Sequence, residues 1–112
     1  MEKNVNMSLL LDFYGSMLTD KQRETVDLYY NNDLSLAEVA ELIGISRQGV
    51  HDRIIKSEEI LKNFELKLGL AADFDMMKST LTFVAGRLDE IKNQTGADID
   101  DVISAVNKLI EL

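Results

Sequence analysis

The chain of 112 residues contains no cysteine, no proline and no tryptophan, and it has a single histidine. Without cysteine there is no disulfide framework, no thiolate zinc site and no cysteine nucleophile, which fits a cytoplasmic protein. The absence of proline favours helix. No apolar run approaches the ~20 residues that cross a bilayer, and residues 1–6 lack the basic-then-apolar pattern of a signal peptide. We therefore expect a cytoplasmic protein without a membrane span.

Positive charge is also scarce: the chain has 12 basic and 20 acidic residues, which gives a formal net charge of −8. This balance works against general affinity for nucleic acid, because phosphate contacts need clustered cations. The cations are not spread evenly. Residues 44–57 hold Arg47, Arg53 and Lys56 against Asp52, a local balance of +2, whereas residues 71–112 hold four basic and eight acidic residues, a balance of −4. A small positive field is therefore expected in one segment only.

That segment carries the pattern of a helix-turn-helix at about residues 35–56. Ser35 and Glu38 form a capping box that predicts the start of a helix. Gly44 follows as a turn that can take positive φ, and Ser46 caps a second helix. The alternative is a plain helical hairpin that uses the same turn only for packing, since the motif depends on its context.

The apolar periodicity predicts further helices on both sides of this motif. Thr19 and Gln22 form a second capping box, so a helix is expected to start at Asp20. Two seams at heptad spacing follow, out of phase with one another, which predicts a bend near residues 69–73. Their members, first seam and then second, are Val50, Ile54, Ser57, Leu61, Phe64, Leu68 and Ala71, then Phe74, Met77, Leu81, Val84, Leu88, Ile91 and Thr95.

The two ends of the chain complete a prediction of six helices. Before residue 20, one apolar helix face is expected from Leu9, Leu10, Phe13, Tyr14, Met17 and Leu18. After Gly96, Asp98 is expected to cap a last helix whose first turn holds Asp100 and Asp101, where the helix dipole favours acids.

We predict an all-α fold in two parts, without a winged-helix element. Residues 1–68 form a helical head that contains the helix-turn-helix, and residues 69–112 form an acidic helical extension. The seams extend beyond what a three-helix head needs to cover. Either a second copy of the chain covers the remaining apolar surface, giving a homodimer, or the extension folds back on its own head.

The candidate contact residues for nucleic acid lie on the outer face of the second helix of the motif: Ser46, Arg47, Gln48, His51, Arg53 and Lys56. Arg47 lies in the first turn, where side chains reach base edges or phosphate, and Gln48 can read adenine. The competing interpretations are a solvated or acid-paired Arg47, a neutral surface Gln48, a purely capping Ser46 and an exposed surface His51. Lys56 can instead pair with Asp52 four residues earlier. We expect no metal, no cofactor and no catalytic activity.

The chain resembles the YlxM-like family of small bacterial helix-turn-helix proteins, most closely from Leu10 to Leu68. The resemblance rests on residues 12–14 (Asp-Phe-Tyr), residues 18–23, Tyr29-Tyr30 and residues 35–52. The helix-turn-helix alone also resembles region 4 of bacterial sigma factors. The resemblance implies an all-helical fold with an elongated C-terminal part and a role beside the signal recognition particle.

These observations lead to one preferred hypothesis and one alternative. The preferred hypothesis is a non-enzymatic regulator that inserts the second helix of its motif into a DNA major groove, with the long helices spacing two heads. The alternative is an accessory factor of the signal recognition particle that binds its protein or its RNA. Since a helix does not easily enter the deep, narrow major groove of duplex RNA, RNA contacts would fall on phosphates or loops.

Overall fold

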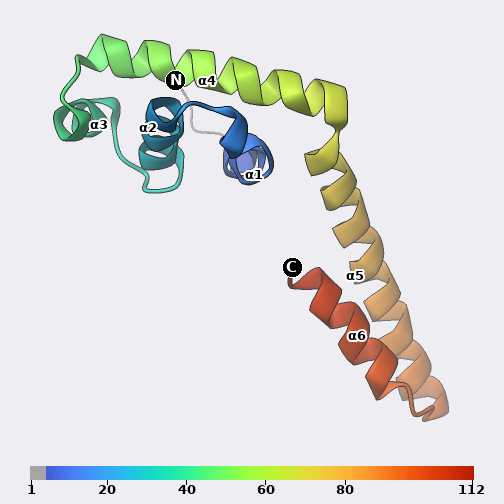
Figure 1. Ribbon diagram of the computed structural model, residues 1–112. Helices are drawn as coiled ribbons and strands as arrows, with labels where there is room; N and C mark the ends of the chain where they lie inside the picture. The colour runs from blue at the N-terminus through green and yellow to red at the C-terminus, as the bar shows by residue number, and fades with distance from the viewer. Residues whose placement is uncertain (1–4) are drawn as a thin grey trace. The chain divides into compact units, whose positions relative to one another are not determined.

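The computed structural model describes residues 5–112, and within that range the chain is entirely helical (Figure 1). The elements are α1 (Val5–Tyr14), the 3-10 helix η1 (Gly15–Met17), α2 (Asp20–Tyr30), α3 (Leu36–Ile43), α4 (Arg47–Leu68), α5 (Leu70–Thr95) and α6 (Asp100–Ile110). The predicted all-α class and the six α-helices are confirmed. In the range described, none of the helices has the length and apolar character needed to cross a membrane.

The chain divides into two compact units, and the boundary falls within the first turn of α5. The first unit ends at Ala71 and the second runs Ala72–Leu112. In the first unit, α4 packs against α1, α2 and α3. This long helix is therefore the element that holds the other three together.

Two buried clusters build the first unit along α4. One joins α1 and α2 to the middle of α4: Met7, Leu10, Leu11, Tyr14, Leu18, Val26, Leu61 and Ala71. The other joins α2 and α3 to the start of α4: Tyr29, Val39, Val50 and Ile54. Full burial of apolar side chains of this size contributes roughly 1.5–3 kcal/mol each, so the second cluster fixes α3 against α4.

Local signals in the sequence set most of the helix boundaries. The capping boxes Thr19–Gln22 and Ser35–Glu38 are both formed, with the side chain and the backbone of each pair bonded reciprocally. Gly69 ends α4 in the left-handed conformation at φ 64°. The predicted bend near residues 69–73 is therefore confirmed as a break between α4 and α5.

Five residues assigned to an apolar helix face or seam are exposed, and there the prediction was wrong: Met17, Leu68, Met77, Ile91 and Thr95. Met17 is 59% exposed, because the chain tightens into the 3-10 helix after Tyr14 and the helical phase changes. Leu68 is 54% exposed, because α4 ends there, while Ala71 from the start of α5 joins the buried cluster. Met7 and Leu11 are buried instead, which the seam had missed.

The predicted cap of the last helix was also wrong. The N-cap of α6 is Ile99, without a side-chain hydrogen bond, and Asp98 lies one residue too early to serve. The reason is a tight turn after Gly96 in which the Ile99 N–H donates to the Ala97 carbonyl at 3.1 Å. Asp100 and Asp101 do occupy the first turn of α6, as expected.

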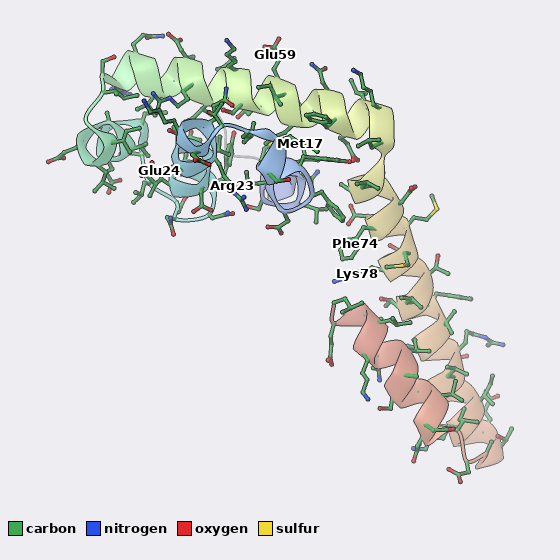
Figure 2. The ribbon with its side chains drawn as sticks, viewed as in Figure 1. Met17, Arg23, Glu24, Glu59, Phe74 and Lys78 are labelled. Carbon is green, nitrogen blue, oxygen red and sulfur yellow. The ribbon has the colours of Figure 1, made fainter. Side chains whose placement is uncertain are left out.

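The second unit is a pair of helices with almost no core. α6 runs back alongside α5 (Figure 1), and an ion pair of 2.5 Å joins Lys92 Nζ to Asp100 Oδ1. Ala85 is the one buried residue of this unit. On the side near α6, Lys78 Nζ lies 4.8 Å from the centroid of the Phe74 ring (Figure 2).

Candidate nucleic-acid interface

The turn between α3 and α4 has the geometry of a helix-turn-helix. Gly44 takes φ 74°, a left-handed conformation that a side chain would strain. Ile45 packs beside the buried cluster, and the Ser46 hydroxyl accepts a hydrogen bond of 3.0 Å from the Gly49 N–H. Val50 is fully buried one turn on. These contacts fix where α4 starts and which face it turns outward.

Gly49 fits closely against that turn. A Cβ placed on this residue would lie 3.1 Å from Ser46 Oγ and 3.5 Å from Ile45 Cδ1. Glycine inside a helix costs roughly 1 kcal/mol relative to alanine. The close approach of the capping hydroxyl accounts for a glycine at this position.

The first turn of α4 presents the strongest candidate contacts. Arg47 and Gln48 are exposed, and His51 is half-buried. Together with Leu36 from the start of α3 they line a shallow depression of about 500 Å³. Within residues 5–112, Arg47 has neither a hydrogen bond nor an ion pair, so its guanidinium is available to a ligand.

Asp52 organises two of the other candidates. Gln48 Nε2 donates to Asp52 Oδ1 at 2.9 Å, and His51 Nδ1 lies 3.5 Å from the same oxygen. The His51 nitrogen is shielded from solvent and makes no hydrogen bond with the described part of the chain. A ligand that approaches His51 and Gln48 therefore meets a carboxylate beside them.

Arg53 is directed toward the head as well as toward solvent. Its Nη1 donates to Thr25 Oγ1 at 3.2 Å, and the Thr25 hydroxyl donates to the Lys21 carbonyl at 2.7 Å. Thr25 is fully buried. Sequence reasoning missed Thr25, because its role depends on a residue 28 positions away. A guanidinium has five N–H donors, so Arg53 keeps donors for phosphate while it is held in place.

Lys56 is exposed, and the positive segment ends shortly after it. Glu59, about three residues further along α4, projects away from α1–α3 (Figure 2). A phosphate chain that follows the outer face of α4 would meet this acid one turn beyond Lys56. The candidate interface is therefore confined to the first ten residues of α4.

Side-chain bonds between helices hold α4 at this position. The Tyr30 hydroxyl of α2 donates to Glu58 Oε1 of α4. Burial is the main cause that raises the pKa of Tyr30 well above 10, and the bond to Glu58 adds to it. The rings of Tyr29 and Tyr30 meet edge to face at 5.0 Å, with Tyr29 buried, so they do not form an exposed platform for base stacking.

No group of three or more histidine, cysteine or acidic side chains in residues 5–112 is arranged to hold a metal ion. The candidate site consists of the cations, amide and imidazole named above.

Comparisons with known proteins agree with this geometry. The sequence profile of the family described as "UPF0122: Putative helix-turn-helix protein, YlxM / p13 like" matches residues 1–102. A UPF0122 protein of Thermoanaerobacter sp. (strain X514) is 42% identical over 106 residues, covering 94% of this chain and 91% of that protein. One from Clostridium kluyveri is 40% identical over 103 residues, 92% of this chain and 93% of its own length. One from Streptococcus gordonii is 44% identical over 84 residues, 75% and 76%.

Proposed function

The chain belongs to the UPF0122 family of helix-turn-helix proteins, and from this premise we propose that it is a non-enzymatic, cytoplasmic regulator that binds DNA through the start of α4. The observation that carries the proposal is the exposed Arg47, which pairs with no group in residues 5–112 and lies in the first turn of a helix held by a helix-turn-helix. In such motifs the N-terminal residues of the second helix contact base edges in the major groove.

The other candidates take roles that follow from their surroundings. Gln48 reads a base edge after exchanging its bond to Asp52 for one to the base. Lys56 and Arg53 contact phosphate, with Arg53 positioned by Thr25. Ser46 stays a cap whose hydroxyl proton is free for a phosphate oxygen, since its oxygen accepts from Gly49. His51 supplies a further base or phosphate contact.

With few cations and a net charge of −8, binding should be modest. Because it depends on phosphate contacts it should weaken as salt rises, with a slope set by the small number of those contacts. Fluorescence anisotropy against random duplex DNA at about 50 and 200 mM salt tests this dependence. We expect Arg47→Glu to abolish binding. The matched control is Lys108→Glu, which makes the same charge change at an exposed residue of α6. If the two variants lose binding equally, net charge and not the α4 face determines the affinity, and the proposal fails.

One observation favours a second function, an accessory role in the signal recognition particle pathway through protein or RNA contacts. Leu42 and Ile55 are exposed, one on each helix of the motif. Apolar side chains on such a surface suit a protein partner better than phosphate. The same anisotropy assay with the particle's RNA, and a pull-down with its protein, distinguish the two functions. Loss of the pull-down on Leu42→Glu with DNA binding absent at low salt would establish the second.

A further inference from the structure

The second unit cannot be stable as an isolated pair of helices. Its 41 residues bury one side chain, Ala85, and none of α6 is buried. Units of about 40 residues rarely fold without an additional source of stability such as oligomerisation. Another apolar surface must therefore cover this pair of helices. The exposed apolar residues of α5 and α6 show which side of the pair it covers.

Besides Leu112, which follows α6, six large apolar side chains in the helices of this unit are exposed: Met76, Met77, Phe83, Ile91, Val102 and Leu109. Met76 is 70% exposed and Phe83 68%. The half-buried residues are different ones and include Leu81 and Leu88 on α5 and Ile103 and Val106 on α6. We take the side that they occupy as the one that faces the other helix. The exposed set therefore forms a second stripe on each helix.

The two stripes lie on the same side of the pair. With about 100° of rotation per residue, the exposed stripe lies about 110° from the half-buried one on α5 and about 80° from it on α6. The displacement has the same rotational sense along each helix. α5 and α6 run antiparallel and face each other (Figure 1). A rotation in the same direction about each helix axis, viewed along the chain, therefore brings the exposed stripe of both helices to the same side of the pair. We call this face, formed by the six exposed residues, the apolar face.

Its size matches a specific interface. The exposed parts of the six residues amount to roughly 600 Å² per chain, whereas a specific interface buries ~800 Å² per partner, of which slightly more than half is apolar. The acids Asp75 and Asp89 fall on the opposite side of α5, so their charges do not prevent contact between two such faces.

We infer that a second copy of the chain covers this face, with α5 packed antiparallel against α5 of the second copy and Thr80 at the symmetry axis. The order of residues along the stripe is symmetric about Thr80. Asp73 lies seven positions before Thr80 and Arg87 lies seven positions after it. Met77 lies three positions before Thr80 and Phe83 lies three positions after it. An antiparallel pairing therefore sets each Met77 against Phe83 of the second copy.

The same pairing sets each acid against a base. Asp73 of one chain meets Arg87 of the second copy at the rim of the contact, twice in a two-fold dimer. Arg87 already pairs with Glu90 at 2.8 Å, and its remaining donors can serve Asp73. Small Thr80 at the centre lets the two helices approach. A different protein would have no reason to match this symmetry, so the pattern favours a second copy.

Cysteine cross-linking gives the sharpest test, because the chain has no cysteine of its own. In the full chain, Thr80→Cys should oxidise to a covalent dimer, since the two residues face each other across the axis. Thr82→Cys is the matched control: it lies two positions on, at the opposite side of α5, and should remain a monomer under denaturing conditions. Equal cross-linking of both variants, or none at Thr80→Cys, would overturn the inference.

Sedimentation of charge variants provides an independent readout. Asp73→Arg alone, and Arg87→Asp alone, should each raise the dissociation constant of the dimer about 10-fold, since each places like charges together twice. The double variant should restore it, which a merely structural effect would not do. Phe83→Glu should raise the constant about 100-fold, with Thr82→Glu unchanged. A wild-type chain that stays monomeric at about 100 μM would exclude the dimer and leave the chain's own head, or another protein, as the cover. The inference does not depend on what the head binds.

Discussion

The Tyr14 hydroxyl of α1 donates a hydrogen bond of 2.6 Å to Glu65 Oε1 of α4, across 51 positions of sequence. The same hydroxyl accepts from the Leu70 N–H at 3.1 Å, and Glu65 Oε1 accepts from the Ala71 N–H at 3.0 Å. The first N–H groups of a helix have no partner inside it. Tyr14 and Glu65 therefore supply, from two other helices, the cap that the start of α5 lacks.

The first prediction concerns this cap. Glu65→Ala removes the acceptor for both Tyr14 and Ala71, so the amides of residues 70 and 71 should exchange with solvent several-fold faster. Hydrogen exchange followed by NMR measures the effect. Glu65→Gln keeps an acceptor oxygen and should show a smaller change. Glu59→Ala, an exposed acid on the same helix, should show none. Unchanged exchange in Glu65→Ala would mean that the cap is dispensable.

A second prediction follows from the hydroxyls of Tyr14 and Tyr30, which both donate to glutamates of α4. Burial, followed by the bonds to Glu65 and Glu58, raises the pKa of Tyr14 and of Tyr30 above 10. Above pH 10 the unfolded chain loses these protons while the folded chain keeps them. The folded state then binds more protons, and the free energy of unfolding must fall as pH rises.

Urea denaturation between pH 8 and pH 11 checks this dependence. The free energy of unfolding should be level up to about pH 10 and fall beyond it. The double variant Tyr14→Phe with Tyr30→Phe should have a smaller slope above pH 10. The same slope in this variant and in the wild type would show that other groups cause the alkaline loss.

The third prediction compares two neighbouring isoleucines on α4. Ile54 is fully buried between α2 and α3, whereas Ile55 is exposed. Ile54→Ala should lower the free energy of unfolding by roughly 2–5 kcal/mol, because it leaves a cavity. Ile55→Ala should change it by less than about 0.5 kcal/mol. Similar losses in the two variants would contradict the packing of α3 against α4.

The fourth prediction compares two cations of the candidate interface. Arg53 donates to the buried hydroxyl of Thr25, while Lys56 is exposed. Arg53→Ala should destabilise the fold by about 1 kcal/mol, since it also leaves Thr25 with one partner fewer. Lys56→Ala should be neutral within about 0.5 kcal/mol. Chemical denaturation measures both, and a neutral Arg53→Ala would show that the bond to Thr25 does not persist in solution.

A fifth prediction tests the two residues that were expected to cap helices. Ser46 accepts from the Gly49 N–H, so Ser46→Ala should lower the free energy of unfolding by about 1 kcal/mol. Asp98 lies outside α6 and caps nothing there, so Asp98→Ala should leave the thermal midpoint unchanged. A loss of stability in Asp98→Ala would restore the interpretation that the structure replaces.

The helix boundaries of the head could be predicted from sequence because they depend on residues within four positions of one another. The Ser35–Glu38 box, the left-handed Gly44 and the Ser46 cap are bonds inside a single turn of chain. Val50 and Ile54 were correctly placed inward, because helical spacing sets them on one face. The outward positions of Arg47 and Gln48 follow from the same periodicity.

How these helices are held together, and which polar groups stay available to a ligand, could be seen only from the packed helices. The partner of Tyr14 lies 51 positions away and that of Arg53 lies 28 positions away, distances over which periodicity carries no information. The structure also shows Met17 exposed, because a short 3-10 helix changes the helical phase after Tyr14. Asp98 lies outside α6, because a tight turn after Gly96 delays the start of that helix. The caps of α2, α3 and α4 and the apolar faces of the helices could be read from the residue order, because they depend on interactions between residues close in the chain. Which long-range groups meet depends on the packing of whole helices, and only their arrangement in space could decide it.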